Sequence, residues 1–335
     1  MTPVIQVWKG GADLLAGPMG AYFLRATFHD AAGGENDTFE VELDDDARQI
    51  PLPQEDDMLA PIAGYLETGV AALGQFKVND WETGCEDGPE TIVIKARAAT
   101  MTGDIKAGGL KHFDDKTLRE VLEDTAKGAG LSVAIDPALA SIKLPYVLRW
   151  EASPIDFATR IAAEAGGIVK PAGGKLTVTK RGSGKGVGGT ELPPIRVTRI
   201  GSAGWRINGT PRPRHGKVVA AWLDPKTGRR KTVEHKAGGK GPPHTLLHPR
   251  PSEDEAKRAA QARATELTMA TGGGHFIVPF SAANSAGAKV IASGFGDGID
   301  GTWFSESIET TWAKGQPVLS TITVTANPDG KGGGT

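Results

Sequence analysis

Apolar and polar positions alternate along much of the N-terminal third of the chain. Phe39, Val41 and Leu43 are apolar while their neighbours are polar, and residues 22–29 show a similar alternation. A period of two places successive side chains on opposite faces of a strand, so these runs predict strands with one buried and one solvated face. Helical periodicity is absent here. Residues 1–113 are therefore predicted to form a first, all-β domain.

Two pairs of alternating runs predict antiparallel hairpins. Near the C-terminus, residues 301–312 and 318–326 are rich in aromatic, Thr and β-branched residues and are separated by a Gly/Pro turn. Residues 74–83 and 91–98 repeat this arrangement within the first domain. The likeness suggests two copies of one β-module. Chance is an equal alternative, because any two hairpins share turn residues and alternation.

The hydrophobic period changes near residue 114. Thr117 and Glu120 fit a capping box at the start of a helix, and Ser153 followed by Pro154 fits the start of a second helix. Short apolar runs between and after these helices indicate strands. Residues 114–181 are therefore predicted to be a compact α+β module inserted after the first β-domain.

A glycine-rich segment precedes the second β region. Residues 182–194 are predicted to be a flexible linker. Its GSGKG segment lacks the glycine spacing of a phosphate-binding loop, and Gly186 stands where Ser or Thr would have to follow the Lys. Residues 195–326 are predicted to form a second β-domain with a helix at 252–270, and residues 327–335 a disordered tail.

Charge is distributed unevenly although the formal net charge is only -2. Residues 1–100 contain 18 Asp and Glu against 6 Lys and Arg, a balance of -12, whereas residues 196–250 contain 13 basic and 2 acidic residues, a balance of +11. Such segregation suggests that the two regions attract each other, across domains or across subunits; two solvated faces are the alternative. The N-terminus lacks a basic leader and no run has the length of a membrane span, so we expect a protein made in soluble form with no membrane partner.

Few residues indicate catalysis or a cofactor. His244 and His248 have the spacing of two ligands on a helix, but prolines surround them and no Cys, Asp or Glu lies close in sequence. Paired carboxylates such as Asp114 and Asp115 are numerous, and carboxylates in turns stay solvated. Cys85 has no second cysteine with which to form an internal disulfide. We therefore predict no enzymatic activity, no cofactor and no metal site.

The basic region leaves nucleic-acid binding as an alternative function. Its Lys and Arg side chains are of the kind that neutralises phosphates. Trp205 and Trp222 supply few aromatic surfaces for stacking single strands. An acidic protein surface is an equally good partner, and the chain itself carries one, so nucleic acid is not the partner we expect.

Six segments, taken in order, carry a family resemblance. They are GQFKV with PETIVIKARA, TLREVLEDTAKGAGL, SPIDFATRIAAEAGG, WLDPKTGRRKTVEH, SEDEAKRAAQARATEL and DGIDGTWFSESIETTW. In this order the chain resembles the late control protein D family, the hub of contractile phage tails, which is related to the hub portion of type VI secretion spike proteins. The α+β module alone also looks like small modules in the periplasmic rings of secretins, but that likeness leaves both β regions unexplained.

The family resemblance implies a homotrimeric hub. Each subunit is expected to be mainly β, with two related tube-like β-barrel domains and an α+β insertion. Three subunits would present six similar units, which match a sixfold tail tube on one side and a threefold spike on the other. The expected partners are the tail tube protein, a spike protein on a separate polypeptide, the tape measure protein and other baseplate proteins. The expected location is the virion tail baseplate, assembled in the host bacterial cytoplasm, and a tail-associated peptidoglycan-degrading enzyme is the remaining alternative.

The resemblance also nominates structural and contact residues. In the first barrel, Phe76, Val78, Ile92 and Ile94 are expected to be equivalent to Trp303, Ser305, Ile322 and Val324 in the second. Phe304 and Ile308 complete the expected barrel and ring positions. The basic residues expected to contact the acidic region of a neighbouring subunit are Arg212, Arg214, Arg229, Arg230 and Lys231.

Overall fold

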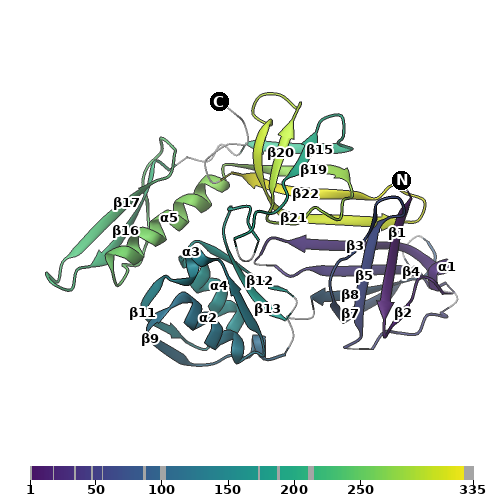
Figure 1. Cartoon of the computed structure of the whole chain (residues 1–335), viewed down its shortest axis with the longest axis horizontal. Coiled ribbons are helices and arrows are strands. Elements are labelled where there is room, and N and C mark those ends of the chain that lie inside the picture. The colour runs from purple at the N-terminus through teal and green to yellow at the C-terminus, as the bar shows by residue number, and fades with distance from the viewer. Residues whose placement is uncertain are drawn as a thin grey trace.

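The structure is a computed structural model that describes residues 2–17, 19–33, 35–46, 48–54, 56–85, 88–98, 103–172, 174–186, 189–209 and 215–327. Strands make up 49% and helices 16% of the chain, which confirms the mainly β fold with an α+β insertion. Figure 1 shows the three parts: a long sheet, an α+β module below it and an arm that projects to one side. The predicted tail lies, from residue 328 on, outside the described residues.

Strands follow one another through the first region, as the alternation predicts. Phe39, Val41 and Leu43 are buried, and so are Phe76 and Ile92, because each projects from the same face of its strand. The elements are β1 (Pro3–Lys9), β2 (Ala12–Asp13), α1 (Met19–Tyr22), β3 (Phe23–Ala31), β4 (Thr38–Asp44), β5 (Met58–Tyr65), β6 (Gly69–Ala72), β7 (Phe76–Gly84) and β8 (Thr91–Ala98).

The α+β module has its own hydrophobic core between two capped helices and two small sheets. The Oγ1 of Thr117 accepts a hydrogen bond from the N–H of Glu120, whose carboxylate accepts one from the N–H of Thr117, so the predicted capping box is present. Phe157 is fully buried in this core. The elements are η2 (Gly103–Lys106), β9 (Lys111–Thr117), α2 (Leu118–Lys127), β10 (Ser132–Ile135), α3 (Pro137–Ala140), β11 (Lys143–Arg149), α4 (Pro154–Glu164), β12 (Gly167–Ala172) and β13 (Lys175–Lys180).

The second β region divides into sheet strands and a separate arm. The elements are β14 (Ile195–Thr198), β15 (Gly204–Gly209), β16 (Lys217–Leu223), β17 (Arg230–Lys236), β18 (His244–Thr245), α5 (Glu253–Met269), β19 (Gly272–Pro279), β20 (Lys289–Ser293), β21 (Gly301–Ala313) and β22 (Leu319–Ala326). Within the predicted linker, the N–H of Gly186 donates to the carbonyl of Thr190 and the N–H of Leu192 donates to the carbonyl of Gly184, so residues 184–186 pair with residues 190–192. None of the described helices is both long and apolar enough to cross a membrane.

The arm consists of the β16–β17–β18 sheet and α5, and it leaves the main sheet as the green segment of Figure 1. Its core is narrow: Val218 and Ala220 of β16 pack against a stripe of buried alanines on α5, at Ala256, Ala260 and Ala264. A spacing of four keeps these alanines on one helical face, and their small side chains allow the helix to approach the sheet closely.

The main sheet contains 14 strands and runs in the order β15–β19–β22–β21–β3–β4–β8–β7–β5–β1–β2, with β20, β14 and β6 attached beside this path. The expectation of two closed barrels is corrected here, because within the described part of the chain this sheet does not close. The reason lies in β21, which is long enough to pair with strands of both β regions and so joins them into one sheet.

The two β regions nevertheless repeat one topology. Pairing order in the first repeat is β3–β4–β8–β7–β5–β1, and in the second repeat it is β15–β19–β22–β21–β20–β14. Taken in this order, each strand of one repeat corresponds to a strand of the other, and the chain visits them in the same sequence. The repeats differ at one edge, where β1 is antiparallel to β5 but β14 is parallel to β20. The arm is an insertion between β15 and β19 of the second repeat.

Candidate functional site

The hairpins β7–β8 and β21–β22 show the duplication residue by residue. Val78 lies opposite Ala96 before a register shift, and Ser305 lies opposite Val324 before the same kind of shift. One extra residue bulges in each opening strand. The N–H of Val78 donates to the carbonyl of Asp57 (2.8 Å), and that of Ser305 donates to the carbonyl of Ala288 (3.0 Å). Asp57 and Ala288 each directly precede corresponding strands, β5 and β20.

This register agrees with one half of the predicted equivalence and corrects the other half. Phe76 and Val78 correspond to Trp303 and Ser305, as expected. In the closing strands, however, Ile94 and Ala96 correspond to Ile322 and Val324, so the expected match of Ile92 and Ile94 was two residues out of register. A shift of two keeps the same face buried, and hydrophobic alternation alone does not distinguish the two alignments.

The nine expected barrel positions are all buried in the sheet. Phe76, Val78, Ile92 and Ile94 belong to the core of the first repeat, where none exceeds 7% exposure. In the second repeat, Trp303, Phe304, Ile308, Ile322 and Val324 are exposed by 5% or less. These side chains stabilise the interior of the sheet, so any contact between subunits has to come from other residues.

The edge of β21 is where the two repeats meet. Along one side β21 pairs with β22, while its other side is shared, with Gly301–Phe304 pairing with β20 and Ser307–Ala313 pairing with β3. Glu306 bulges between these halves, and its carbonyl accepts a hydrogen bond from the N–H of Ala32 (2.8 Å). The bulge thus redirects one continuous strand from one repeat to the next.

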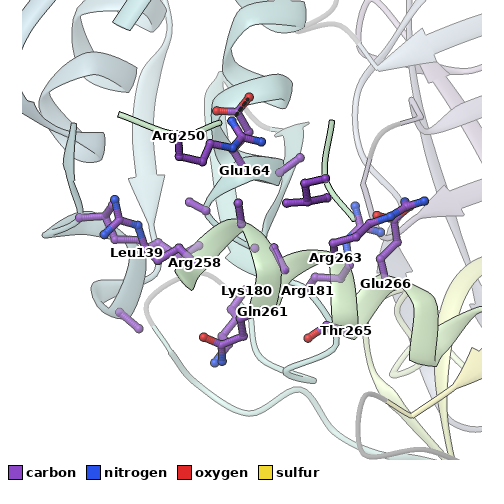
Figure 2. A pocket seen from close by; sticks show the side chains of 18 residues that line it. Leu139, Glu164, Lys180, Arg181, Arg250, Arg258, Gln261, Arg263, Thr265 and Glu266 are labelled. Carbon is purple, nitrogen blue, oxygen red and sulfur yellow. Dashed lines mark ion pairs between the residues drawn. The ribbon is translucent and has the colours of Figure 1, made fainter. Parts of the chain in front are cut away.

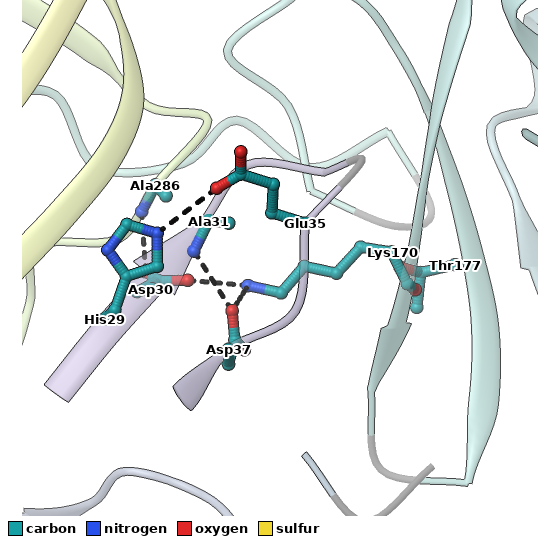
Figure 3. A network of polar contacts seen from close by, with 8 residues as sticks. All are labelled: His29, Asp30, Ala31, Glu35, Asp37, Lys170, Thr177 and Ala286. Atoms are coloured by element: carbon teal, nitrogen blue, oxygen red, sulfur yellow. Dashed lines mark hydrogen bonds and ion pairs between the residues drawn. The ribbon is translucent and has the colours of Figure 1, made fainter. Parts of the chain in front are cut away.

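A partly buried ion cluster fastens the α+β module to this junction (Figure 3). The Nζ of Lys170, on β12, lies 2.6 Å from Oδ1 of Asp30 and 3.0 Å from Oδ1 of Asp37. The other oxygen of Asp30 accepts from the N–H of Ala286 (2.7 Å), and Asp37 accepts from the N–H of Ala31 (3.0 Å). Asp30 therefore holds the first repeat, the α+β module and the second repeat at one point.

The charges in this cluster do not cancel. Burial disfavours the Lys170 ammonium, but Asp30 and Asp37 outweigh it and raise the pKa of Lys170. Burial is the largest effect on Asp37 and raises the pKa of its carboxyl. The neighbouring Asp30 also raises this pKa, and the attraction of Lys170 offsets only part of the increase. The raised pKa of Lys170 keeps its ammonium charged, and the raised pKa of Asp37 makes its carboxyl easier to protonate than an ordinary aspartic acid.

A groove separates α5 from the α+β module and has a volume of about 450 Å³ (Figure 2). Its charged side chains largely pair with one another: Arg250 lies 3.4 Å from Glu164, and Arg263 lies 2.7 Å from Glu266. The described residues include no cluster of three or more His, Cys, Asp or Glu able to hold a metal ion. The ion pair between Arg250 and Glu164 joins the arm to the α+β module across this groove, whereas Arg263 and Glu266 both belong to α5.

Three of the five expected basic contact residues belong to the described part of the chain. Arg229, Arg230 and Lys231 lie together at the turn and start of β17 on the arm, whereas Arg212 and Arg214 lie outside the described residues. Lys231 pairs with Asp224 at 2.6 Å and its ammonium lies 5.5 Å from the centre of the Trp222 ring.

Neither the arm as a separate layer nor the role of Lys170 is predicted from the sequence. The alanine spacing on α5 was a readable signal for the arm. Nothing local marks Lys170, because its partners lie about 140 residues away in the sequence.

Comparisons with known proteins agree with this architecture. No family model matches the sequence. The probable baseplate hub protein of Escherichia phage P2 is 28% identical over 229 residues, covering 68% of this chain and 58% of the relative. That of Escherichia phage 186 is 27% identical over 247 residues, covering 72% and 63%. The chain thus spans about three fifths of the length of these curated relatives.

Solved structures show the same fold at low sequence identity. The 43 kDa tail protein of prophage MuSo2 from Shewanella oneidensis has a TM-score of 0.72 at 15% identity, with 98% of this chain and 100% of that one covered. A tail protein from Neisseria meningitidis MC58 has a TM-score of 0.73 at 11% identity, covering 98% and 97%. The E. coli c3393 protein, a component of the type VI secretion system, has a TM-score of 0.59 at 9% identity, covering 95% and 76%.

The chain has the fold of phage tail proteins, with two related β repeats, an α+β module and an arm. Both sequence relatives are probable baseplate hub proteins, and together the comparisons support a relationship of this chain to the phage baseplate/tail hub family.

Proposed function

We propose that this protein is a structural hub of a phage tail baseplate, in which three copies form a ring. The observation that carries the proposal is the duplication: six strands of each repeat follow one order, and two hairpins share one bulge position. One chain supplies two similar units, so three chains supply six. A ring of this kind presents six similar units to a sixfold tube and three identical subunits to a threefold spike.

The partners proposed for the ring follow from this symmetry. The tail tube protein would contact one face, a spike protein the other, and the tape measure protein the interior, with other baseplate proteins around the rim. The role is non-enzymatic, because the ring acts through surface shape and symmetry. The particle location is the virion tail baseplate, with assembly in the host bacterial cytoplasm. The names of the curated relatives support the baseplate context.

Light scattering on the purified full chain tests the assembly. Each chain has a mass of 35.0 kDa, so three give 105 kDa (3 × 35.0). A trimer supports the proposal. A species that stays dimeric or tetrameric over a range of concentrations contradicts it. Cryo-electron microscopy of the trimer, viewed along the ring axis, is expected to show six lobes of alternating type.

A further inference from the structure

The groove between α5 and the α+β module has an apolar lining. Ala262 lies two positions after Ala260, and at 3.6 residues per turn this places it on nearly the opposite face of α5 from the alanines that pack against β16. A side chain added at Gly166 would lie 3.7 Å from the Cβ of Ala262, so the helix and the module meet at this point. The other apolar side chains that line the groove include Leu139, Ile142, Ala163, Leu246 and Ala259.

Charges around this apolar lining are unbalanced. Five basic side chains and two carboxylates line the groove, a net charge of +3 (5 − 2). Both carboxylates are already paired, Glu164 with Arg250 and Glu266 with Arg263. Among the residues that the structure describes, no carboxylate lies within ion-pair distance of the other three cations, which are Lys180, Arg181 and Arg258. Figure 2 shows Arg258, Arg263 and Glu266 along α5, the pale green helix.

Two further carboxyls lie near these cations without forming an ion pair with them. Burial raises the pKa of Glu255 and of Glu306, and the attraction of Arg258 and of Arg181, respectively, offsets only part of the increase. The cations therefore stabilise these two carboxylates only weakly. Their positive charge remains available to a group that enters the groove.

A second hollow continues the groove past Arg250. It has a volume of about 260 Å³ and shares Arg250 and Arg258 with the first. Along α5 the two hollows extend from Glu255 to Glu266, which is 11 positions (266 − 255), or about 16 Å at 1.5 Å per residue. An extended chain covers this distance with about five residues. Tyr146, which is 54% exposed, lines the second hollow and offers an aromatic contact.

This lining favours an acidic peptide over nucleic acid. Single-stranded nucleic acid is held by several aromatic side chains that stack on the bases and by a row of cations along the backbone. Tyr146 is the single aromatic side chain in the described lining of the two hollows, and two of the five cations in the first are already paired with carboxylates. Apolar side chains flanked by Arg and Lys match a chain segment that carries both apolar residues and carboxylates.

We propose that this groove binds a short acidic segment of another protein, with apolar side chains on Ala262 and its neighbours and carboxylates on Lys180 and Arg258. Arg and Lys form charge-assisted hydrogen bonds with carboxylates, and the pair of Arg250 and Glu164 already does so in the same groove. Partial enclosure strengthens such contacts relative to an open surface. The site belongs to the arm and the module and does not depend on the proposed ring.

Fluorescence anisotropy with labelled synthetic peptides tests the proposal on the full chain. The main probe alternates Glu and Leu over the length of the groove. A second peptide has Gln in place of Glu, which removes the charge, and a third has Ser in place of Leu, which removes the apolar surface. We expect the Glu–Leu peptide to bind about tenfold more tightly than either control peptide. A thymidine oligonucleotide of similar length should bind more weakly than the Glu–Leu peptide.

Two double variants locate the binding. Lys180→Gln with Arg258→Gln removes two of the free cations from the groove, and we expect it to weaken binding of the Glu–Leu peptide about tenfold. The control, Arg230→Gln with Lys236→Gln, removes the same two types of charge from exposed positions on β17. It should weaken binding by less than about twofold. Circular dichroism checks that both variants retain the fold.

Three outcomes would overturn the proposal. Equal weakening by the two double variants would show general attraction to a basic protein, and absence of binding to the Glu–Leu peptide below about 1 mM would show that the groove does not take such a segment. An oligonucleotide that binds as tightly and loses as much affinity in the groove variant would assign the groove to nucleic acid. Thr265→Trp, which narrows the groove without removing a charge, is a second variant and should also weaken the Glu–Leu peptide. None of these results bears on the trimer, so the hub function is tested separately.

Discussion

Val78 and Ser305 occupy the same position in two copies of one hairpin, each directly before a one-residue bulge. Each donates its N–H to the carbonyl of the residue that precedes a corresponding strand, β5 or β20. Both side chains are buried, at 2% and 0% exposure. Their chemistry differs, because the Oγ of Ser305 has no hydrogen-bond partner among the described residues. A buried hydroxyl without a partner destabilises the folded state by about 1–3 kcal/mol.

Replacing Ser305 by Val is therefore expected to stabilise the protein. Val is the residue that the first repeat carries at this site, and it removes the unpaired hydroxyl while adding a buried methyl group. We expect a gain of about 1 kcal/mol in the free energy of unfolding, measured by urea denaturation. The reciprocal change, Val78→Ser, is the matched test and should destabilise by about 2 kcal/mol. If both substitutions destabilise equally, the two sites do not share an environment.

Lys170→Met should loosen the joint at which Asp30 and Asp37 hold the α+β module. Removing the ammonium leaves two largely buried carboxylates, 13% and 15% exposed, without a counter-charge, which costs about 3 kcal/mol in the free energy of unfolding. The matched control is Lys217→Met, which breaks an ion pair with Glu234 whose two side chains are 41% and 53% exposed. Because exposed pairs contribute little, the control is expected to change stability by less than about 1 kcal/mol.

The effect of Lys170→Met should also depend on pH with a defined sign. Burial already raises the pKa of Asp37 in the native protein, and losing Lys170 raises it further. A raised carboxyl pKa favours the folded state at low pH, where the group is neutral, and disfavours it as pH rises through that pKa. The deficit of the variant relative to wild type is therefore expected to shrink from pH 7 to pH 5. A deficit that stays constant would mean that the carboxylates are not its cause.

Features that depend on residues close together in the sequence are predicted well. The capping box at Thr117, the N-cap at Ser153 and the alternation in β4 all involve residues within a few positions of each other, and each appears in the structure. The repeated hairpin was also visible in composition, because turn residues and β-branched residues recur at similar distances.

What the sequence did not determine depends on pairing between distant segments. The division of the β21 edge between β20 and β3 is set by contacts with residues 25–31, and the bulge at Glu306 becomes visible only when strand partners are known. The two-residue error at Ile92 and Ile94 has the same origin, since any even shift preserves the alternation. Lys170 was missed because charged residues are common on surfaces, and its burial depends on strands in another part of the chain.

Asp224 is expected to titrate far below an ordinary carboxyl. The Lys231 ammonium, then the N–H of Lys226 and the hydroxyl of Thr227, lower the pKa of Asp224 to about 2 from a usual 3.8. Since the folded-state pKa is depressed, the stability contributed by this group is present above pH 3.8 and is lost as pH falls through about 2. Carboxyl NMR should report a pKa near 2, and Lys231→Met should move it upward. An unchanged pKa in the variant would exclude Lys231 as the main cause.

The arm should be intolerant of larger side chains on the face of α5 that meets β16. Ala260 is fully buried in the cluster that also contains Val218 and Ala220, and its neighbour Gln261 is exposed. Ala260→Leu forces added atoms into a closely packed contact and is expected to cost about 1–3 kcal/mol. Gln261→Leu, a change to the same residue one position along the helix, should alter stability by less than about 0.5 kcal/mol. Thermal unfolding followed by circular dichroism compares the two variants. Equal effects would show that α5 does not pack against β16 through its alanine stripe.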